Sequence, residues 1–213
     1  MTGPRVVLDA CVLFPTVMRE VLMGCAAAGL FDPRWSARIL EEWARATAKI
    51  GAEVVARGEV ALLRARWPGA EVQVPDAALA RFWLPDPNDI HVLAAAVLGH
   101  ADLILTLNAR DFPRDLLQAE GVKRADPDTF LCGLFARSPD QVREVVNSVV
   151  AEACRLSGEA WTVRTLLKKA KLNRLPRHWS GTGHSDAFGR CPWQAPSGLP
   201  AWAAQQSDRH AKA

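Results

Sequence analysis

Four acidic side chains that lie far apart in the sequence are the residues best suited to chemistry: Asp9, Glu42, Asp89 and Asp111. Asp9 ends a short apolar run, and a carboxylate that closes a buried strand has no ready structural role. Asp111 follows the apolar run 103–107, and Asp89 lies in the first turn of a helix expected just before that run. Because ligands of an open parallel sheet bind at the carboxyl ends of its strands, these three carboxylates are expected to meet.

Glu42 is expected at the same site because it lies beside the apolar stripe of a helix. Ser36 is a suitable N-cap for that helix, and the stripe runs through Ile39 and Trp43. A carboxylate beside a buried stripe needs a partner, whereas Glu41, about 100° round the helix, is expected to be a solvated surface charge. An error of one residue in the helix phase would exchange the two glutamates.

Carboxylates brought this close together predict a bound cation. Two of them about 4 Å apart repel each other by about 4 kcal/mol at an effective dielectric constant near 20. They must therefore take up protons or bind a cation, and ligation by oxygen atoms favours Mg²⁺ or Mn²⁺. The expected metal ligands are Asp9, Asp89 and Asp111. Since such an ion orients water and stabilises phosphoryl oxygens, the expected substrate is a phosphodiester.

Alternating strands and helices must position these side chains. Short apolar runs predict strands, and amphipathic or capped runs predict helices. The strands are expected at 5–9, 30–35, 72–74, 103–107 and 122–125, and the helices at 15–28, 36–56, 59–67, 89–98 and 127–136. The alternation is typical of βαβ units and predicts an α/β fold with a parallel sheet.

The composition changes after residue 136. An amphipathic helix over 139–156 and a basic helical segment over 161–172 are expected to form an extension that covers residues 137–179. From 180 to 213 the chain is rich in Gly, Pro, Ser, Gln and Ala, which predicts disorder.

The spacing of the cysteines and the length of the apolar runs indicate the cellular compartment of the protein. The five cysteines include no CxxC pair, which is typical of buried thiols in a reducing cytosol. No signal peptide is recognised at the start, and no run reaches the roughly 18 apolar residues of a membrane span. We therefore expect a cytoplasmic protein that does not contact a membrane.

Four segments, in order, resemble the successive motifs of PIN-domain ribonucleases, and the chain is similar to the bacterial branch that includes VapC-type toxins. They are Leu8–Leu13 (LDACVL), Ser36–Trp43 (SARILEEW), Pro85–Ala96 (PDPNDIHVLAAA) and Thr106–Phe112 (TLNARDF). The resemblance covers residues 5–136, so the nuclease domain is expected over 1–136. Each motif alone is short, but four in order at suitable separations are fairly specific.

The resemblance assigns roles residue by residue. It implies that Asp9, Glu42, Asp89 and Asp111 are the catalytic acids, and that Thr106 and Asn108 take supporting positions, with Asp86 as an extra acid beside them. Glu41 is kept among the supporting residues only as the alternative to Glu42. Asn108 lies where many members have another aspartate. The missing carboxylate weakens a second metal position, so one bound ion is favoured over two. Ala10-Cys11 lies where many toxins have Thr-Asn, which leaves the groups around Asp9 open.

The resemblance also implies a fold and a function. The expected fold is a three-layer α/β/α sandwich with a central parallel sheet. The expected activity is Mg²⁺- or Mn²⁺-dependent cleavage of single-stranded RNA, by the toxin of a toxin–antitoxin pair. Expected partners are an RNA substrate, an antitoxin protein and a second copy of the chain.

Positive charge in the extension suits an RNA substrate. Residues 159–179 carry six basic side chains and one acidic, whereas residues 1–158 carry 17 basic and 20 acidic. The side chains expected to contact RNA phosphates are Arg164, Lys168, Lys169 and Lys171. The alternative is a solvated helix face, and Trp161 and Trp179, which flank the segment, are expected to anchor it rather than stack on bases.

Two other functions stay open. One is a catalytically inactive PIN-like protein that acts as a scaffold through binding alone, an alternative that Asn108 supports. The other is a phosphatase of the haloacid dehalogenase type, which also begins with a strand-ending aspartate. That chemistry needs a second acid two residues after the first, where this chain has Cys11.

Overall fold

A five-stranded parallel sheet forms the centre of the protein, whose computed structural model describes residues 3–181. The strand order is β3-β2-β1-β4-β5, and every neighbouring pair runs parallel. The strands are β1 (Arg5–Leu8), β2 (Asp32–Ser36), β3 (Glu71–Val72), β4 (Leu103–Leu105) and β5 (Lys123–Ala125). The α/β fold with a central parallel sheet is therefore confirmed.

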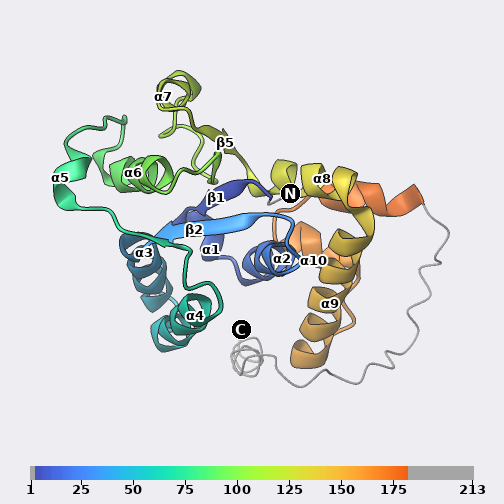
Figure 1. The fold of residues 1–213 in the computed structure, drawn as a ribbon. Helices are drawn as coiled ribbons and strands as arrows, with labels where there is room; N and C mark the ends of the chain where they lie inside the picture. Colours follow the sequence, from blue (N-terminus) through green and yellow to red (C-terminus); the bar gives the residue numbers. More distant parts are fainter. Residues whose placement is uncertain (1–2, 182–213) are drawn as a thin grey trace.

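Helices cover both faces of the sheet and give the expected three layers (Figure 1). One face carries α2 (Thr16–Ala27), α3 (Ala37–Ala48) and α4 (Glu53–Arg66), and the other carries α5 (Asp76–Leu79), α6 (Ile90–Leu98) and α7 (Arg114–Ala119). The largest fully buried side chains are Trp35 of β2 and Trp43 of α3, which pack in the first of these layers.

The order of the strands reverses beside β1, which places two strand ends next to each other. The chain runs from β1 outward to β2 and β3, and then crosses to β4 on the other side of β1. Leu8 of β1 is in register with Leu105 of β4, and the backbone N–H of Asp9 donates to the carbonyl of Leu105 at 3.1 Å. The residues that follow β1 and β4 thus share one edge, where open α/β sheets bind ligands.

The single helix predicted over 36–56 is wrong, because the chain turns between α3 and α4. Ser36 does cap α3, since its hydroxyl accepts from the backbone N–H of Ile39 at 3.3 Å. Gly51 then has a φ of +67°, a left-handed conformation that glycine adopts without steric cost. α4 begins at Glu53 and includes most of the helix that the sequence placed at 59–67.

Two short helical turns that the sequence did not predict lie beside the carboxyl edge of the sheet. Asp9 is the N-cap residue of α1 (Ala10–Leu13), directly after β1. The 3₁₀ turn η1 (Pro87–Asp89) precedes α6 and is capped by Asp86, whose carboxylate accepts from the backbone N–H of Asn88 at 2.9 Å. Both turns therefore begin at an aspartate.

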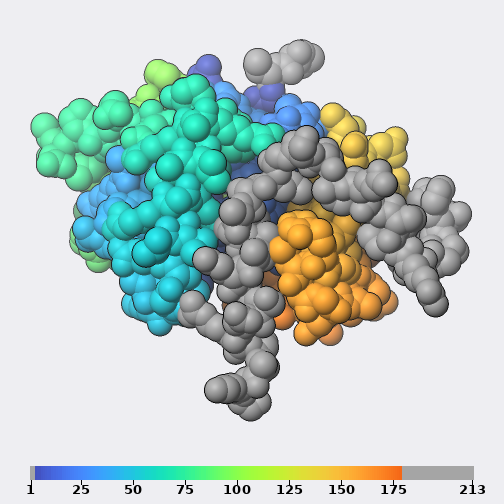
Figure 2. Space-filling view, turned by 90° about the horizontal axis from the view of Figure 1, so that it is seen from below, coloured from blue at the N-terminus to red at the C-terminus, as the bar shows by residue number. Residues whose placement is uncertain are grey.

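The C-terminal helices pack against the first helical layer. α8 (Pro127–Arg137) leads into the long α9 (Pro139–Ser157), which lies along α2 (Figure 1) and contributes the buried Val142 and Val146. Seen from below, α4 in cyan and α9 in orange are on the same side of the molecule (Figure 2). α10 (Val163–Lys169) and the 3₁₀ helix η2 (Leu175–Gly181) follow.

The Asp128 carboxylate of α8 ties the start of η2 to the domain. It accepts the backbone N–H groups of Arg174 at 2.7 Å and Leu175 at 3.0 Å. The tail predicted to be disordered over 180–213 lies, from residue 182 onward, outside the described residues. None of the helices in the described part of the chain is long and apolar enough to cross a membrane.

Candidate active site

Three carboxylates form a compact cluster next to the carboxyl edge of the sheet. One oxygen each of Asp86, Asp89 and Asp111 lies within 4.8 Å of the other two, and all three side chains are half-buried. Asp86 and Asp89 come from the two ends of η1, and Asp111 comes from the loop after β4. The sequence predicted Asp89 and Asp111 as metal ligands and Asp86 as a supporting residue, and the structure brings all three to the same place.

Asp89 shows that this cluster suits a cation. Its Oδ2 atom is buried and has no hydrogen-bond partner among the described residues. Burial, and then the charges of Asp9, Asp86 and Asp111, raise the pKa of Asp89 to about 6. A buried carboxylate oxygen that receives no donor is unusual, and a positive ion would satisfy it. Since the donors are carboxylate oxygens, the residues present fit Mg²⁺ or Mn²⁺.

Asp9 lies beside this cluster and is held by the ends of two strands. Its side chain is 7% exposed, and its Oδ2 atom accepts the Thr106 hydroxyl at 2.7 Å and the Cys11 thiol at 3.1 Å. Thr106 in turn accepts the backbone N–H of Asn108 at 3.0 Å. The charge of Asp9 contributes to the raised pKa of Asp89, so the two carboxylates act on one another.

Cys11 occupies the position that the sequence left open. Besides donating to Asp9, its sulfur accepts the backbone N–H of Leu107 at 3.2 Å. Burial, and then the negative charge of Asp9, raise the pKa of the Cys11 thiol to about 12. The thiol is therefore protonated at neutral pH and can serve as a hydrogen-bond donor.

Glu42 is held from two sides next to the segment that carries Asp89. Its Oε1 atom lies 3.0 Å from Nε2 of His91 and accepts from Nε of Arg38 at 3.1 Å. Arg38 also donates to the carbonyl of Asn88, at 3.5 Å. Burial raises the pKa of Glu42, but His91 and Arg38 outweigh it, so the pKa is lowered and the carboxylate is ionised.

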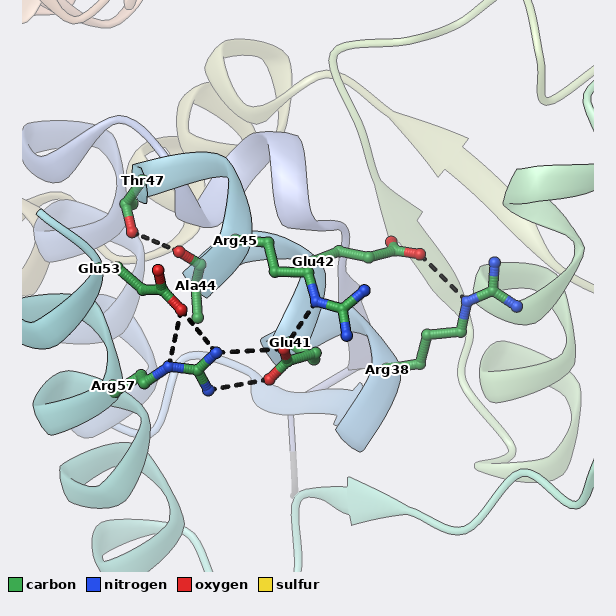
Figure 3. A network of polar contacts seen from close by, with 8 residues as sticks. All are labelled: Arg38, Glu41, Glu42, Ala44, Arg45, Thr47, Glu53 and Arg57. Atoms are coloured by element: carbon green, nitrogen blue, oxygen red, sulfur yellow. Dashed lines mark hydrogen bonds and ion pairs between the residues drawn. The ribbon is translucent and has the colours of Figure 1, made fainter. Parts of the chain in front are cut away.

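Glu41 points to a different part of the molecule (Figure 3). It forms ion pairs with Arg45 at 2.7 Å and with Arg57 of α4 at 3.0 Å, and Arg57 also binds Glu53. The hydrogen bonds from Arg57 and Arg45 lower the pKa of Glu41 to about 2. Its role is thus to join α3 to α4, and the separation of the two glutamates agrees with the helix phase expected from the sequence.

Asn108 adds a hydrogen-bond donor at the position where the resemblance described above implies a further acid. Its side-chain amide donates to Oδ2 of Asp111. An aspartate at this position would instead repel Asp111. Asn108 therefore orients one carboxylate of the cluster without adding to its negative charge.

The basic side chains of the extension lie on another part of the surface. Arg164, Lys168, Lys169 and Lys171 are exposed on and after α10, whose main contacts are with α9, α2 and η2. Lys169 lies over the Trp161 ring, 4.5 Å from its centre, and the Trp161 indole N–H donates to Ser157 at 3.0 Å. Trp161 therefore anchors α10, as expected, and the side chain of Trp179 lies outside the described part of the chain.

Three residues that contact the acids were not predicted from the sequence. Arg38 and His91 hold Glu42, and Cys11 holds Asp9. His91 is 2% exposed in the otherwise apolar α6, and a lone histidine in such a run was the available signal. Arg38 was visible only as a partner four residues before Glu42 on one helix.

Comparison with known proteins identifies the family. Residues 5–110 match the family model described as "PIN domain", a range that covers β1 to β4 and the acids Asp9, Glu42, Asp86 and Asp89. The chain therefore belongs to the PIN-domain family. The matched range stops at residue 110 and does not include Asp111, which the structure brings next to Asp86 and Asp89.

One curated relative shares part of this region. The chain is 36% identical over 63 residues to "Putative ribonuclease VapC50" of Mycobacterium tuberculosis (strain ATCC 25618 / H37Rv). The aligned segment is 30% of this chain and 37% of that protein, so it spans little more than a third of the relative's length. No solved structure matches the chain significantly.

Proposed function

We propose that the protein is a metal-dependent endoribonuclease that cleaves single-stranded RNA. The observation that carries the proposal is the buried Oδ2 of Asp89, which lies among other carboxylates and receives no hydrogen bond from residues 3–181. The PIN-domain match and the ribonuclease name of the relative support the same activity. The match also counts against the haloacid dehalogenase alternative, which already lacked a second acid at Cys11.

Asp86, Asp89 and Asp111, with Asp9 beside them, would hold Mg²⁺ or Mn²⁺. When bound, such a cation supplies Lewis-acid stabilisation of the negative charge that builds up on the phosphate during cleavage. The carboxylate of Asp9 accepts hydrogen bonds from Thr106 and Cys11, and that of Asp111 accepts one from Asn108. These bonds fix the two carboxylates in place. The metal ligands are therefore oriented before the cation binds, which lowers the free-energy cost of forming the site.

Glu42 would orient the attacking water. Because His91 and Arg38 lower its pKa, Glu42 is an ionised hydrogen-bond acceptor and a weak base. Such a group is better suited to align a water molecule for in-line attack on phosphorus than to act as a general base that keeps the proton of that water. Glu42 is therefore assigned a positioning function at the reacting water.

A toxin role in a toxin–antitoxin pair is the biological context that we propose. It rests on the resemblance of the four motifs to VapC-type toxins, which the VapC50 relative supports, and it makes an antitoxin protein and a second copy of the chain the expected partners. The basic residues on α10 would contact the RNA away from the cut. If the role is correct, expression should arrest bacterial growth, and Asp9→Asn should remove the arrest; a harmless wild-type protein would contradict it.

Cleavage of a panel of single-stranded RNAs, with and without Mn²⁺, tests the enzymatic proposal. Wild-type protein should cut only with the metal, and Asp9→Asn should lower the rate by about 100-fold or more, since a ligand is lost. Equal activity in the two proteins would refute the site. Tight RNA binding without cleavage by the wild type would favour the scaffold alternative, for which Asn108 is the supporting observation.

A further inference from the structure

The thiol of Cys11 connects the two strand ends at which the acidic site is built. Cys11 lies in α1, directly after β1, and accepts the backbone N–H of Leu107, just after β4, at 3.2 Å. Its sulfur lies 3.1 Å from Oδ2 of Asp9 and 3.6 Å from the Thr106 hydroxyl. The sulfur therefore contacts a backbone group and two side chains at the switch point of the sheet.

Both side-chain donors of this group act on the same oxygen of Asp9. The Thr106 hydroxyl donates to Oδ2 at 2.7 Å and the Cys11 thiol donates to it at 3.1 Å. Two donors on one carboxylate oxygen set the rotation of the whole group. Within the part of the chain that the structure describes, Oδ1 of Asp9 receives no hydrogen bond, so Oδ1 is the oxygen left for a further partner.

We propose that Cys11 is a positioning residue, which orients Asp9 so that Oδ1 is presented to the divalent cation. This inference rests on the proposed function. Cys11 and Thr106 are uncharged donors, so they fix Asp9 without cancelling the negative charge that attracts the ion. An arginine or lysine in the same place would hold Asp9 equally well but would compete with the metal.

Cys25 provides a matched control within the same chain. It is 0% exposed in α2, and its thiol has no hydrogen bond to a side chain or a backbone group among residues 3–181. Replacing Cys25 by alanine therefore removes the same atom from a buried place without changing Asp9. Any loss of metal binding that follows only from lower stability will appear in Cys25→Ala as well.

Titration of the full-length protein with Mn²⁺, followed by electron paramagnetic resonance, tests the inference without any RNA. Cys11→Ala and Cys11→Val should each weaken Mn²⁺ binding by about tenfold or more, as for other residues that orient metal ligands. Cys11→Ser, which keeps a donor and an acceptor, should stay within about threefold of wild type, and so should Cys25→Ala. Cys11→Val keeps the bulk of the side chain and serves if the alanine variant does not fold.

The possible outcomes separate this inference from the proposed function. Unchanged affinity in Cys11→Ala and Cys11→Val would overturn the positioning role and leave the metal site in place. A serine variant as weak as the alanine variant would also overturn it, because the hydrogen bond would then not be the cause. A wild-type protein that binds no Mn²⁺ would overturn the proposed metal dependence and this inference with it.

Discussion

Glu42 of α3 lies beside His91 of α6, with Oε1 of Glu42 3.0 Å from Nε2 of His91. His91 is 2% exposed and lies two residues after Asp89, so it relates Glu42 to the acidic cluster. Glu41, the residue before Glu42, instead forms ion pairs with Arg45 and with Arg57 of α4. Two adjacent glutamates on one helix thus have separate functions, and they form a matched pair for mutation.

Glu42→Gln should lower the rate of RNA cleavage by about 100-fold or more, because an amide orients the attacking water poorly. Glu41→Gln makes the same change of charge one residue earlier and should leave the rate within about threefold of wild type. Single-turnover cleavage with saturating Mn²⁺ measures both. A larger loss in Glu41→Gln would reverse the assignment of the two glutamates.

Asp89→Asn should make the metal-free protein more stable at pH 7. Since the folded state raises the pKa of Asp89 from 3.8 to about 6, the folded protein binds more protons than the unfolded one between these values. The contribution of Asp89 to stability is therefore present at low pH and is lost as the pH rises through about 6. Asparagine carries no charge, so the free energy of unfolding of Asp89→Asn at pH 7 should exceed that of the wild type by about 1 kcal/mol after allowance for solvent screening.

Urea unfolding in the presence of EDTA, at pH 4 and at pH 7, measures this effect. The difference in the free energy of unfolding between Asp89→Asn and wild type should be larger at pH 7 than at pH 4. A difference that is the same at both pH values would show that Asp89 is not destabilised by its acidic neighbours.

Arg19→Met should destabilise the fold by about 3 kcal/mol, because it leaves a buried charge without a partner. Arg19 is 4% exposed and pairs with Glu59 of α4 at 2.7 Å, donates to the carbonyl of Leu13 at 2.8 Å, and lies over the ring of Trp43. The expected fall in melting temperature is about 6–12 °C. The double variant Arg19→Met/Glu59→Leu should regain most of the loss, and a double variant no better than the single one would contradict the ion-pair explanation.

Lys168→Ala/Lys171→Ala should weaken RNA binding and reduce its dependence on salt. Each lysine that neutralises a phosphate of single-stranded RNA contributes about 0.7 to the slope of log K against log salt, so the slope should fall by about 1.4. Lys49→Ala/Lys123→Ala removes two exposed lysines elsewhere and is the control. Fluorescence anisotropy at several salt concentrations gives the slopes, and equal slopes in both double variants would reject a phosphate-contacting role for α10.

The parts of the site that depend on a local sequence pattern could be predicted from the sequence. Strand-ending acids in a βαβ alternation placed Asp9 and Asp111 at one edge, and Ser36, which does cap α3, set the helix phase that separates Glu42 from Glu41. The turn at Gly51 was missed because the apolar period of α3 continues into α4 with little change. Glycine alone did not decide between a kinked helix and two helices.

The contacts that orient the acids could not be predicted, because they join residues far apart in the chain. Cys11 and Thr106 are separated by 95 residues, and Arg38 and Asn88 by 50. Asp86 was underestimated for a local reason: the turn η1 brings both of its ends to the same place, and a three-residue turn has no period to detect. The contact between Cys11 and Thr106 depends on the register of β1 and β4, which no motif specifies.

Direct measurement of Mn²⁺ binding by Asp89→Asn tests whether the acidic cluster holds a divalent cation. Isothermal titration calorimetry should show saturable binding to the wild-type protein and an affinity at least about tenfold lower in Asp89→Asn. Asp76→Asn makes the same change of charge at an exposed position of α5 and should bind as wild type does. Equal Mn²⁺ affinity in wild type and Asp89→Asn, or an equal loss in both variants, would show that Asp89 does not bind the cation.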